Sequence, residues 1–325
     1  MAVPSFTDYL AERRILRRRL SFWRVGAFAA LVLGLAVAGL QLLGPEASLR
    51  LKPHVARFSV EGIITGDRAT LKLLEKIENA QAAKAVLIAI DSPGGTTTGA
   101  EQLYGAIRRL SAKKPTVAVV GNIAASGAYI AALGTDQIVA LENSLVGSIG
   151  VLIQYPDVSK MLDTIGVKVE DVKSSPLKAA PNPFEPASPE ARAALAALVG
   201  DSFAWFKSLV KERRSLSGGE LQAVADGRVF TGRQGIGLHL VDRLGGEREA
   251  IDWLEQEKKI PRGLEVEDWK QTQTLERLGI FTLAARAVEL FGLEGLSRAL
   301  DRAAATAKAG MLDGLLSIWQ PRGAN

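Results

Sequence analysis

One stretch near the middle of the chain, residues 117–132, constrains the fold more than any other. It starts with the β-branched apolar run Val117–Val120, passes through small residues to Ser126, and ends in an alanine-rich run at 127–132. The first part is typical of a buried strand and the last part of a helix. We therefore predict a strand, a turn and a helix, with the Ser126 hydroxyl held rigidly where the turn becomes the helix.

Ser126 has the surroundings that a nucleophilic serine needs. Backbone N–H groups at the start of a helix point toward its N-terminus, and small neighbouring side chains let a second backbone approach. The same features occur in many inert turns, so the pattern alone leaves both interpretations open. Ala124 and Ala128 also stand where the nucleophile-elbow motif has glycines.

Composition limits the base that could activate this serine. The chain has two histidines, His54 and His239, and no cysteine. Either histidine could complete a triad, although a core or surface position explains each of them as well. The lack of cysteine excludes thiol chemistry and a cysteine-type zinc site. A serine hydrolase built on this chain is therefore expected to use a lysine.

The residues before this stretch predict a parallel sheet. Strands and helices alternate, as in βαβ units, at 55–60, 67–80, 85–90, 99–110 and 117–120. The run 85–90 ends at the turn Asp91–Gly95, which either simply connects strand to helix or supplies N–H donors facing Ser126. This turn lacks the further glycine and the lysine of a phosphate loop.

Four motifs in order give the chain a family resemblance. They are DSPGG at 91–95, NIAASGAY at 122–129, GSIGV at 147–151 and DGRVFTG at 226–232. Through them residues 58–246 resemble the SppA family of bacterial signal peptide peptidases, which are membrane-anchored Ser/Lys proteases. The resemblance implies an α/β fold of the Clp-protease/crotonase-like type, with a parallel-sheet core, flanking helices and one preceding transmembrane helix.

The resemblance also implies the residues of the site. Ser126 would be the nucleophile and Lys178 the general base, with Ser148 orienting the lysine. The backbone N–H groups of Gly95 and Gly127 would bind the oxyanion. No metal or organic cofactor is implied.

The loop that carries Lys178 departs from the family pattern. The family usually has a glycine shortly before the lysine, whereas this chain has Ser174-Ser175-Pro176. The loop at 168–186 is rich in proline, serine and lysine, so by composition alone Lys178 is a solvated surface charge. The family forms ring-like homo-oligomers in which serine and lysine meet across a subunit boundary, and its substrates are remnant signal peptides and other short, apolar, extended peptides.

The first residues predict a membrane anchor. Residues 1–24 contain six arginines against two acidic residues, and the whole chain has a formal net charge of +5. Because the positive charge is concentrated at one end of the chain, it does not indicate nucleic-acid binding. The uncharged run 25–43 nearly spans the roughly 30 Å hydrocarbon core at ~1.5 Å per residue. It is long for a cleavable signal peptide, although Ala36-Val37-Ala38 resembles a cleavage site.

The charge pattern also predicts orientation and domains. Arginines before the apolar run place residues 1–24 in the cytoplasm and the body in the periplasm, on a bacterial inner membrane. We expect an anchor at 25–43, a linker at 44–54, a protease domain at 55–260 and a helical C-terminal extension at 261–325. The apolar segment 311–319 in this extension could be extra packing, a membrane-surface contact or an oligomer contact.

Two other functions fit the same residues. A crotonase-type enzyme acting on acyl thioesters would use paired backbone N–H groups but would need neither an anchor nor a nucleophilic serine. A catalytically silent membrane scaffold would keep the oligomer without needing Ser126.

Overall fold

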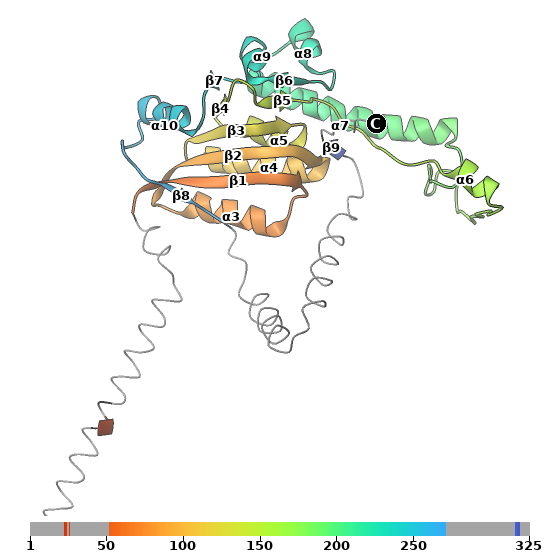
Figure 1. Ribbon diagram of the computed structural model, residues 1–325, viewed down its shortest axis with the longest axis horizontal. Helices are drawn as coiled ribbons and strands as arrows, with labels where there is room; N and C mark the ends of the chain where they lie inside the picture. The colour runs from red at the N-terminus through yellow and green to blue at the C-terminus, as the bar shows by residue number, and fades with distance from the viewer. Residues whose placement is uncertain (1–22, 25, 27–51, 271–315, 319–325) are drawn as a thin grey trace, which may run out of the picture. The chain divides into compact units, whose positions relative to one another are not determined.

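The computed structural model describes residues 23, 24, 26, 52–270 and 316–318. The chain divides into two compact units, Met1–Pro53 and His54–Asn325. The predicted anchor at 25–43 lies outside the described residues except for Gly26. The second unit contains a sheet with helices on both of its faces (Figure 1).

Within the described residues the sheet has nine strands and is mainly parallel. Its order is β6-β5-β3-β2-β1-β8, with β4 beside β3, β7 beside β4 and β9 beside β2. Antiparallel pairs are restricted to β2–β9 and β5–β6. The strands are β1 (His54–Ile64), β2 (Ala83–Thr96), β3 (Thr116–Ala125), β4 (Gln137–Ala140), β5 (Leu145–Gly147), β6 (Val229–Thr231), β7 (Arg243–Leu244), β8 (Val266–Asp268) and β9 (Leu316–Ile318).

The helices bury the two faces of this sheet separately. Because side chains alternate along a strand, Val86, Ile88 and Ile90 of β2 face one core and Ala85 and Leu87 face another. The first core is covered mainly by α3 (Arg68–Asn79), α4 (Thr97–Ser111), α5 (Gly127–Leu133) and the end of α7 (Pro189–Arg214), and the second by α10 (Glu247–Gln256). This is the predicted α/β architecture, and it fits a Clp-protease/crotonase-like fold.

Two segments predicted as turns are strands. β2 continues through Asp91–Gly95 to Thr96, and β3 continues through Gly121 to Ala125. The backbone keeps its partners there, because Ile64 pairs with Gly95 and Gly147 with Ala125. The strands differ in the number of residues here, and register irregularities beside Ser92 accommodate the difference. Glycine and proline therefore interrupt the regular pairing of these strands without ending them.

The predicted helical character of the C-terminal region is wrong at two places. Val266–Asp268 forms β8 on the edge of β1, and Leu316–Ile318 forms β9 on β2. Both segments find unpaired backbone at a strand edge, and this non-local pairing outweighs the local helical pattern.

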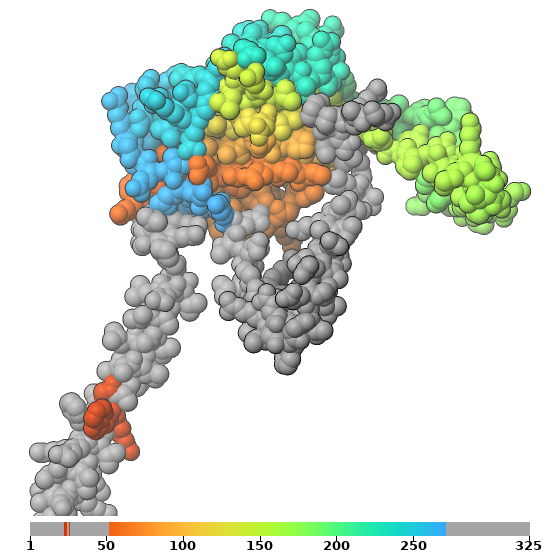
Figure 2. Space-filling view, viewed as in Figure 1, coloured from red at the N-terminus to blue at the C-terminus, as the bar shows by residue number. Residues whose placement is uncertain are grey.

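An arm, residues 152–198, projects away from the sheet (Figures 1 and 2). It contains α6 (Ser159–Thr164) and the first half of α7, while the second half of α7 returns to the core through Phe206, Leu209 and Val210. In the described part of the chain, α7 alone is long and apolar enough to cross a membrane, a criterion that packed helices also meet. The short helices α8 (Gly218–Val224) and α9 (Gly232–Gly237) follow it.

Candidate active site

Ser126 connects β3 to α5 with a strained backbone. Its φ of 57° and ψ of −119° are rare for a residue with a side chain. The Ser126 N–H donates to the Gly147 carbonyl at 2.8 Å, and its own carbonyl accepts from the Ile130 N–H at 3.0 Å. Ser126 is only 1% exposed. This strained strand-to-helix connection resembles that of a nucleophile elbow, although alanines replace the motif's glycines.

Packing of α5 maintains that strain. All of its residues are buried, and the Tyr129 hydroxyl donates to the Leu240 carbonyl at 2.8 Å. Burial raises the pKa of the Tyr129 phenol above its ordinary value, so the group stays a protonated donor. At the other end of the helix, Arg213 donates to the carbonyls of Leu133 and Thr135, each at 2.8 Å. The helix that follows Ser126 is therefore held at both ends.

Ser148 lies beside Ser126. Ala125 and Gly147 are paired on the parallel strands β3 and β5, so each serine is the residue that follows a paired strand end. Ser148 also has a positive φ of 51°, and it is 7% exposed. Its N–H donates to the Arg228 carbonyl at 2.8 Å, which ties this strand end to the segment just before β6.

The two glycines predicted to bind the oxyanion also lie at this edge of the sheet. Gly127 is the buried first residue of α5. Gly95 pairs with Ile64, and a Cβ on Gly95 would lie 1.9 Å from the Ile64 carbonyl oxygen, so only glycine fits. Just before it, Ser92 pairs with Ala124, which brings this end of β2 close to the end of β3. Ser126, Ser148, Gly95 and Gly127 are therefore grouped at one edge.

Lys178 is not brought to Ser126 within the chain. It is exposed in the arm, and its side chain makes no hydrogen bond or ion pair with any residue that the structure describes. Another lysine of the same loop, Lys173, contacts Asp171 at 3.0 Å and Glu185 at 2.9 Å. Hydrogen bonds to these carboxylates raise the pKa of Lys173, which makes it a poor general base.

His54 lies toward the opposite end of the sheet from Ser126. His54 begins β1, whereas Ser126 follows the end of the parallel strand β3. The two residues are therefore roughly 30 Å apart along the strand direction. The buried His54 Nε2 accepts from the Trp269 indole N–H at 3.1 Å, which makes it a core residue. His239 is exposed, and its carbonyl accepts from the Arg214 guanidinium, which also bonds to Asp242. The Asp242 N–H donates to the carbonyl oxygen of Ile138, the partner of Ala118 in the first half of β3.

Comparisons with known proteins identify the family of this chain. Residues 108–261 match the profile of Peptidase family S49. A putative protease of Synechocystis sp. is 38% identical over 62% of this chain and 73% of its own length. The chain belongs to peptidase family S49.

Two further relatives extend the comparison for this S49 peptidase. A putative protease of Methanocaldococcus jannaschii is 33% identical over 58% of the chain and 61% of the relative. A putative signal peptide peptidase SppA of Enterococcus faecium is 30% identical over 63% of the chain and 64% of the relative. The predicted SppA-type resemblance is thus confirmed, and the protein is a serine peptidase. This chain covers less than two thirds of the length of each of these two relatives.

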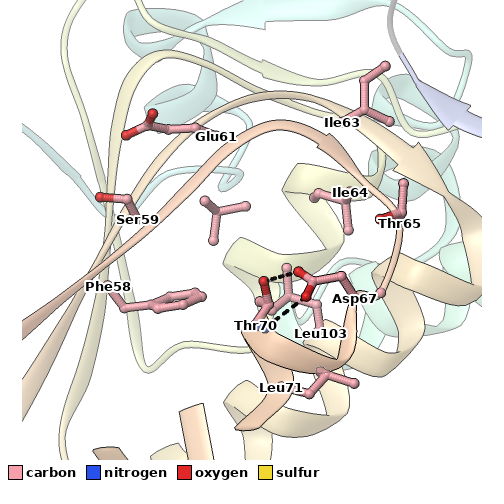
Figure 3. A pocket seen from close by; sticks show the side chains of 12 residues that line it. Phe58, Ser59, Glu61, Ile63, Ile64, Thr65, Asp67, Thr70, Leu71 and Leu103 are labelled. Atoms are coloured by element: carbon pink, nitrogen blue, oxygen red, sulfur yellow. Dashed lines mark hydrogen bonds between the residues drawn. The ribbon is translucent and has the colours of Figure 1, made fainter. Parts of the chain in front are cut away.

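The S49 peptidase also has a cavity of about 120 Å³ beside the active-site edge (Figure 3). Its lining comes from the second half of β1, the loop that follows it, the start of α3 and Leu103 in the middle of α4, and it includes Ile64, the partner of Gly95. Of its two carboxylates, Glu61 and Asp67, the second accepts from the Ala69 N–H at 2.7 Å and from the Thr70 hydroxyl. Asp67 is therefore the N-cap of α3. Among the described residues no cluster of side chains is suited to a metal ion.

Sequence reasoning missed two features of the site. The Ser92 hydroxyl is buried between β1 and β2, where it bonds to both strands. β9 pairs antiparallel with Gly94–Thr96, the same segment that holds Gly95. Neither feature has a local sequence signal, because each depends on residues distant in the chain.

The contact at Gly95 predicts opposite effects for the same substitution at two glycines. Gly95→Ala should lower the free energy of unfolding by about 1–3 kcal/mol and abolish hydrolysis, because its Cβ overlaps the Ile64 carbonyl. Gly105→Ala, in α4, meets Arg109 only at 3.7 Å and should raise stability by up to about 1 kcal/mol. Urea unfolding measures both values, and a wild-type midpoint for Gly95→Ala would contradict the geometry.

Proposed function

We propose that this S49 peptidase is a membrane-anchored endopeptidase with a Ser126/Lys178 dyad. It cleaves short, apolar, extended peptides, with remnant signal peptides as the substrate class. The observation that carries the proposal is the strained, buried backbone of Ser126, grouped with Gly95, Gly127 and Ser148 at one sheet edge. Acyl-thioester chemistry would give such a serine no role.

In the proposed reaction the Ser126 Oγ attacks the scissile carbonyl while the neutral Lys178 amine takes its proton. The N–H groups of Gly95 and Gly127 stabilise the oxyanion of the tetrahedral intermediate. The lysine then returns the proton to the leaving amine, and water hydrolyses the acyl-enzyme by the same path. Ser148 holds the lysine amine near Ser126.

The lysine is supplied by a second copy of the chain in this proposal. Lys178 is exposed on a projecting arm, and the arm carries many exposed apolar side chains, an arrangement that marks interaction surfaces. A ring of such arms would cover these side chains and bring each Lys178 to a neighbour's Ser126. The exposed apolar residues are Leu152, Tyr155, Met161, Ile165, Val167, Val169, Val172, Leu177, Phe184 and Leu198.

An extended substrate fits the edge of β2. Beyond Ser92 this strand leaves β3, and its segment Gly94–Thr96 accepts an antiparallel strand, β9. A peptide that paired there in place of β9 would have its backbone beside Gly95 and close to Ser126. Only segments without stable structure of their own can pair in this way, which supports remnant peptides as substrates.

The dyad and its shared site predict a complementation result. Ser126→Ala, Lys178→Ala and Lys178→Arg should each reduce peptide hydrolysis by at least about 1000-fold, since guanidinium does not deprotonate. In randomly mixed rings of Ser126→Ala and Lys178→Ala chains, about a quarter of the sites would join an intact serine to an intact lysine of the neighbour. Co-assembled mixtures should therefore recover about a quarter of the wild-type activity.

An inactive mixture that is shown to co-assemble would mean that each chain builds its own site. An active Ser126→Ala variant would instead favour the scaffold or thioester alternatives.

Competition with β9 predicts an effect of shortening the chain. Deleting residues 316–325 should lower KM for a peptide substrate and leave kcat unchanged, because the edge of β2 is then free. Deleting only residues 319–325 keeps β9 and is the matched control. Equal KM values for the two shortened chains would show that β9 does not compete with substrate.

We also propose that the 25–43 run anchors the protein in a bacterial inner membrane, with the peptidase unit in the periplasm. A reporter fused beyond Arg50 should be active only in the exported compartment and should sediment with membranes. Recovery of an exported reporter in the soluble fraction would indicate a cleaved signal peptide.

A further inference from the structure

The end of β2 is shaped by two irregularities that meet at one buried serine. Toward β1, the pair Glu61–Asp91 is followed by Ile63–Gly94, so β2 has one residue more than β1. Toward β3, the pair Ile90–Val120 is followed by Ser92–Ala124, so β3 has two residues more. Ser92 lies between these two breaks and is fully buried.

The Ser92 hydroxyl bonds to both sides of the first break. It donates to the Gly62 carbonyl oxygen at 2.6 Å and accepts from the Gly94 N–H at 3.1 Å. Gly62 has a φ of 64° and Gly94 a φ of 109°, values that favour glycine. The hydroxyl therefore bridges the two glycines whose unusual backbone turns the strands at this point.

The same bond determines where the next peptide group lies. Pro93 has no N–H, so the Gly94 N–H is the first backbone donor after Ser92, and the Ser92 oxygen satisfies it. Gly95 follows directly, seated against Ile64 without room for a side chain. The side chains of Asp91 and Asn122 lie nearby and hydrogen-bond to each other at 2.7 Å. They are more exposed than Ser92, and this hydrogen bond involves neither Gly94 nor Gly95.

We propose that Ser92 is a positioning residue for catalysis, which holds the Gly95 N–H in the place where it binds the oxyanion. This inference rests on the proposed function of Gly95. Without the hydroxyl the Gly94 peptide loses its partner and can rotate, and the Gly95 N–H moves with it. Substrate pairing with Gly94–Thr96 is less affected, because it uses several backbone groups instead of one aligned donor.

The expected effect is on kcat. In the full-length chain Ser92→Ala should lower kcat about 10- to 100-fold with KM changed less than about twofold, since small displacements of oxyanion donors have costs of this size. Ser92→Thr keeps the hydroxyl and should retain activity within about threefold of wild type. A peptide aldehyde, which forms a tetrahedral adduct with Ser126, should bind more weakly in proportion to the loss of kcat/KM.

Ser144 provides a matched control. It is 2% exposed, and its hydroxyl likewise donates to strand carbonyls, at Val120 and Gly121, and accepts the Leu141 N–H at 3.0 Å. Ser144→Ala should lower the thermal midpoint about as much as Ser92→Ala but leave kcat and aldehyde affinity near wild type. If Ser92→Ala does not fold, Ser92→Cys and Ser144→Cys replace the pair.

A kcat for the Ser92 variant within threefold of that for its Ser144 counterpart overturns the inference. The proposed function is tested separately in the same assay, by hydrolysis in the wild type and its loss in Ser126→Ala. A wild type without hydrolysis, or an active Ser126→Ala variant, would refute the peptidase mechanism, and the Ser92 inference, which rests on it, would be overturned with it.

Discussion

The backbone of Ser126 is the constraint on which the rest of the site depends. A non-glycine residue with φ of 57° and ψ of −119° is unfavourable, by about 1–3 kcal/mol, unless its surroundings enforce it. Here the surroundings are the pairing of β3 with β5 on one side and the clamped helix α5 on the other. The same pairing places Ser148 beside Ser126, because each serine directly follows one of the two paired strand ends.

Small residues allow that constraint to be met. Ala124, Ala125 and Ala128 are fully buried around Ser126, and larger side chains there would keep β2, β5 and α5 from approaching so closely. Gly95 is the extreme case, because the Ile64 carbonyl occupies the space of its side chain. The alanine-rich character of this stretch is therefore a packing requirement of the active-site edge as well as a helix signal.

The parts of this fold that could be predicted are those determined by local pattern. The periodicity of 67–80, the apolar run 85–90 and the strand–helix stretch around Ser126 each specify an element whose neighbours follow from βαβ topology. The extended course of Asp91–Gly95, the Ser92 bridge and the strand β9 could not be predicted, because non-local pairing decides them. Glycine and proline indicated turns there, but the adjacent strands supplied enough hydrogen bonds to keep the backbone extended.

The two halves of the proposed dyad have opposite physical requirements. The nucleophile needs rigidity, and Ser126 obtains it from a buried core that a single chain can form. A general base must be neutral to accept a proton, and burial favours the neutral form of a lysine. In an isolated chain Lys178 is exposed on the projecting arm, so under the proposal a neighbouring surface supplies that burial. Under the proposed mechanism an isolated chain then carries a positioned serine without an active base. Assembly would then both bury the apolar side chains of the arm and complete the active site.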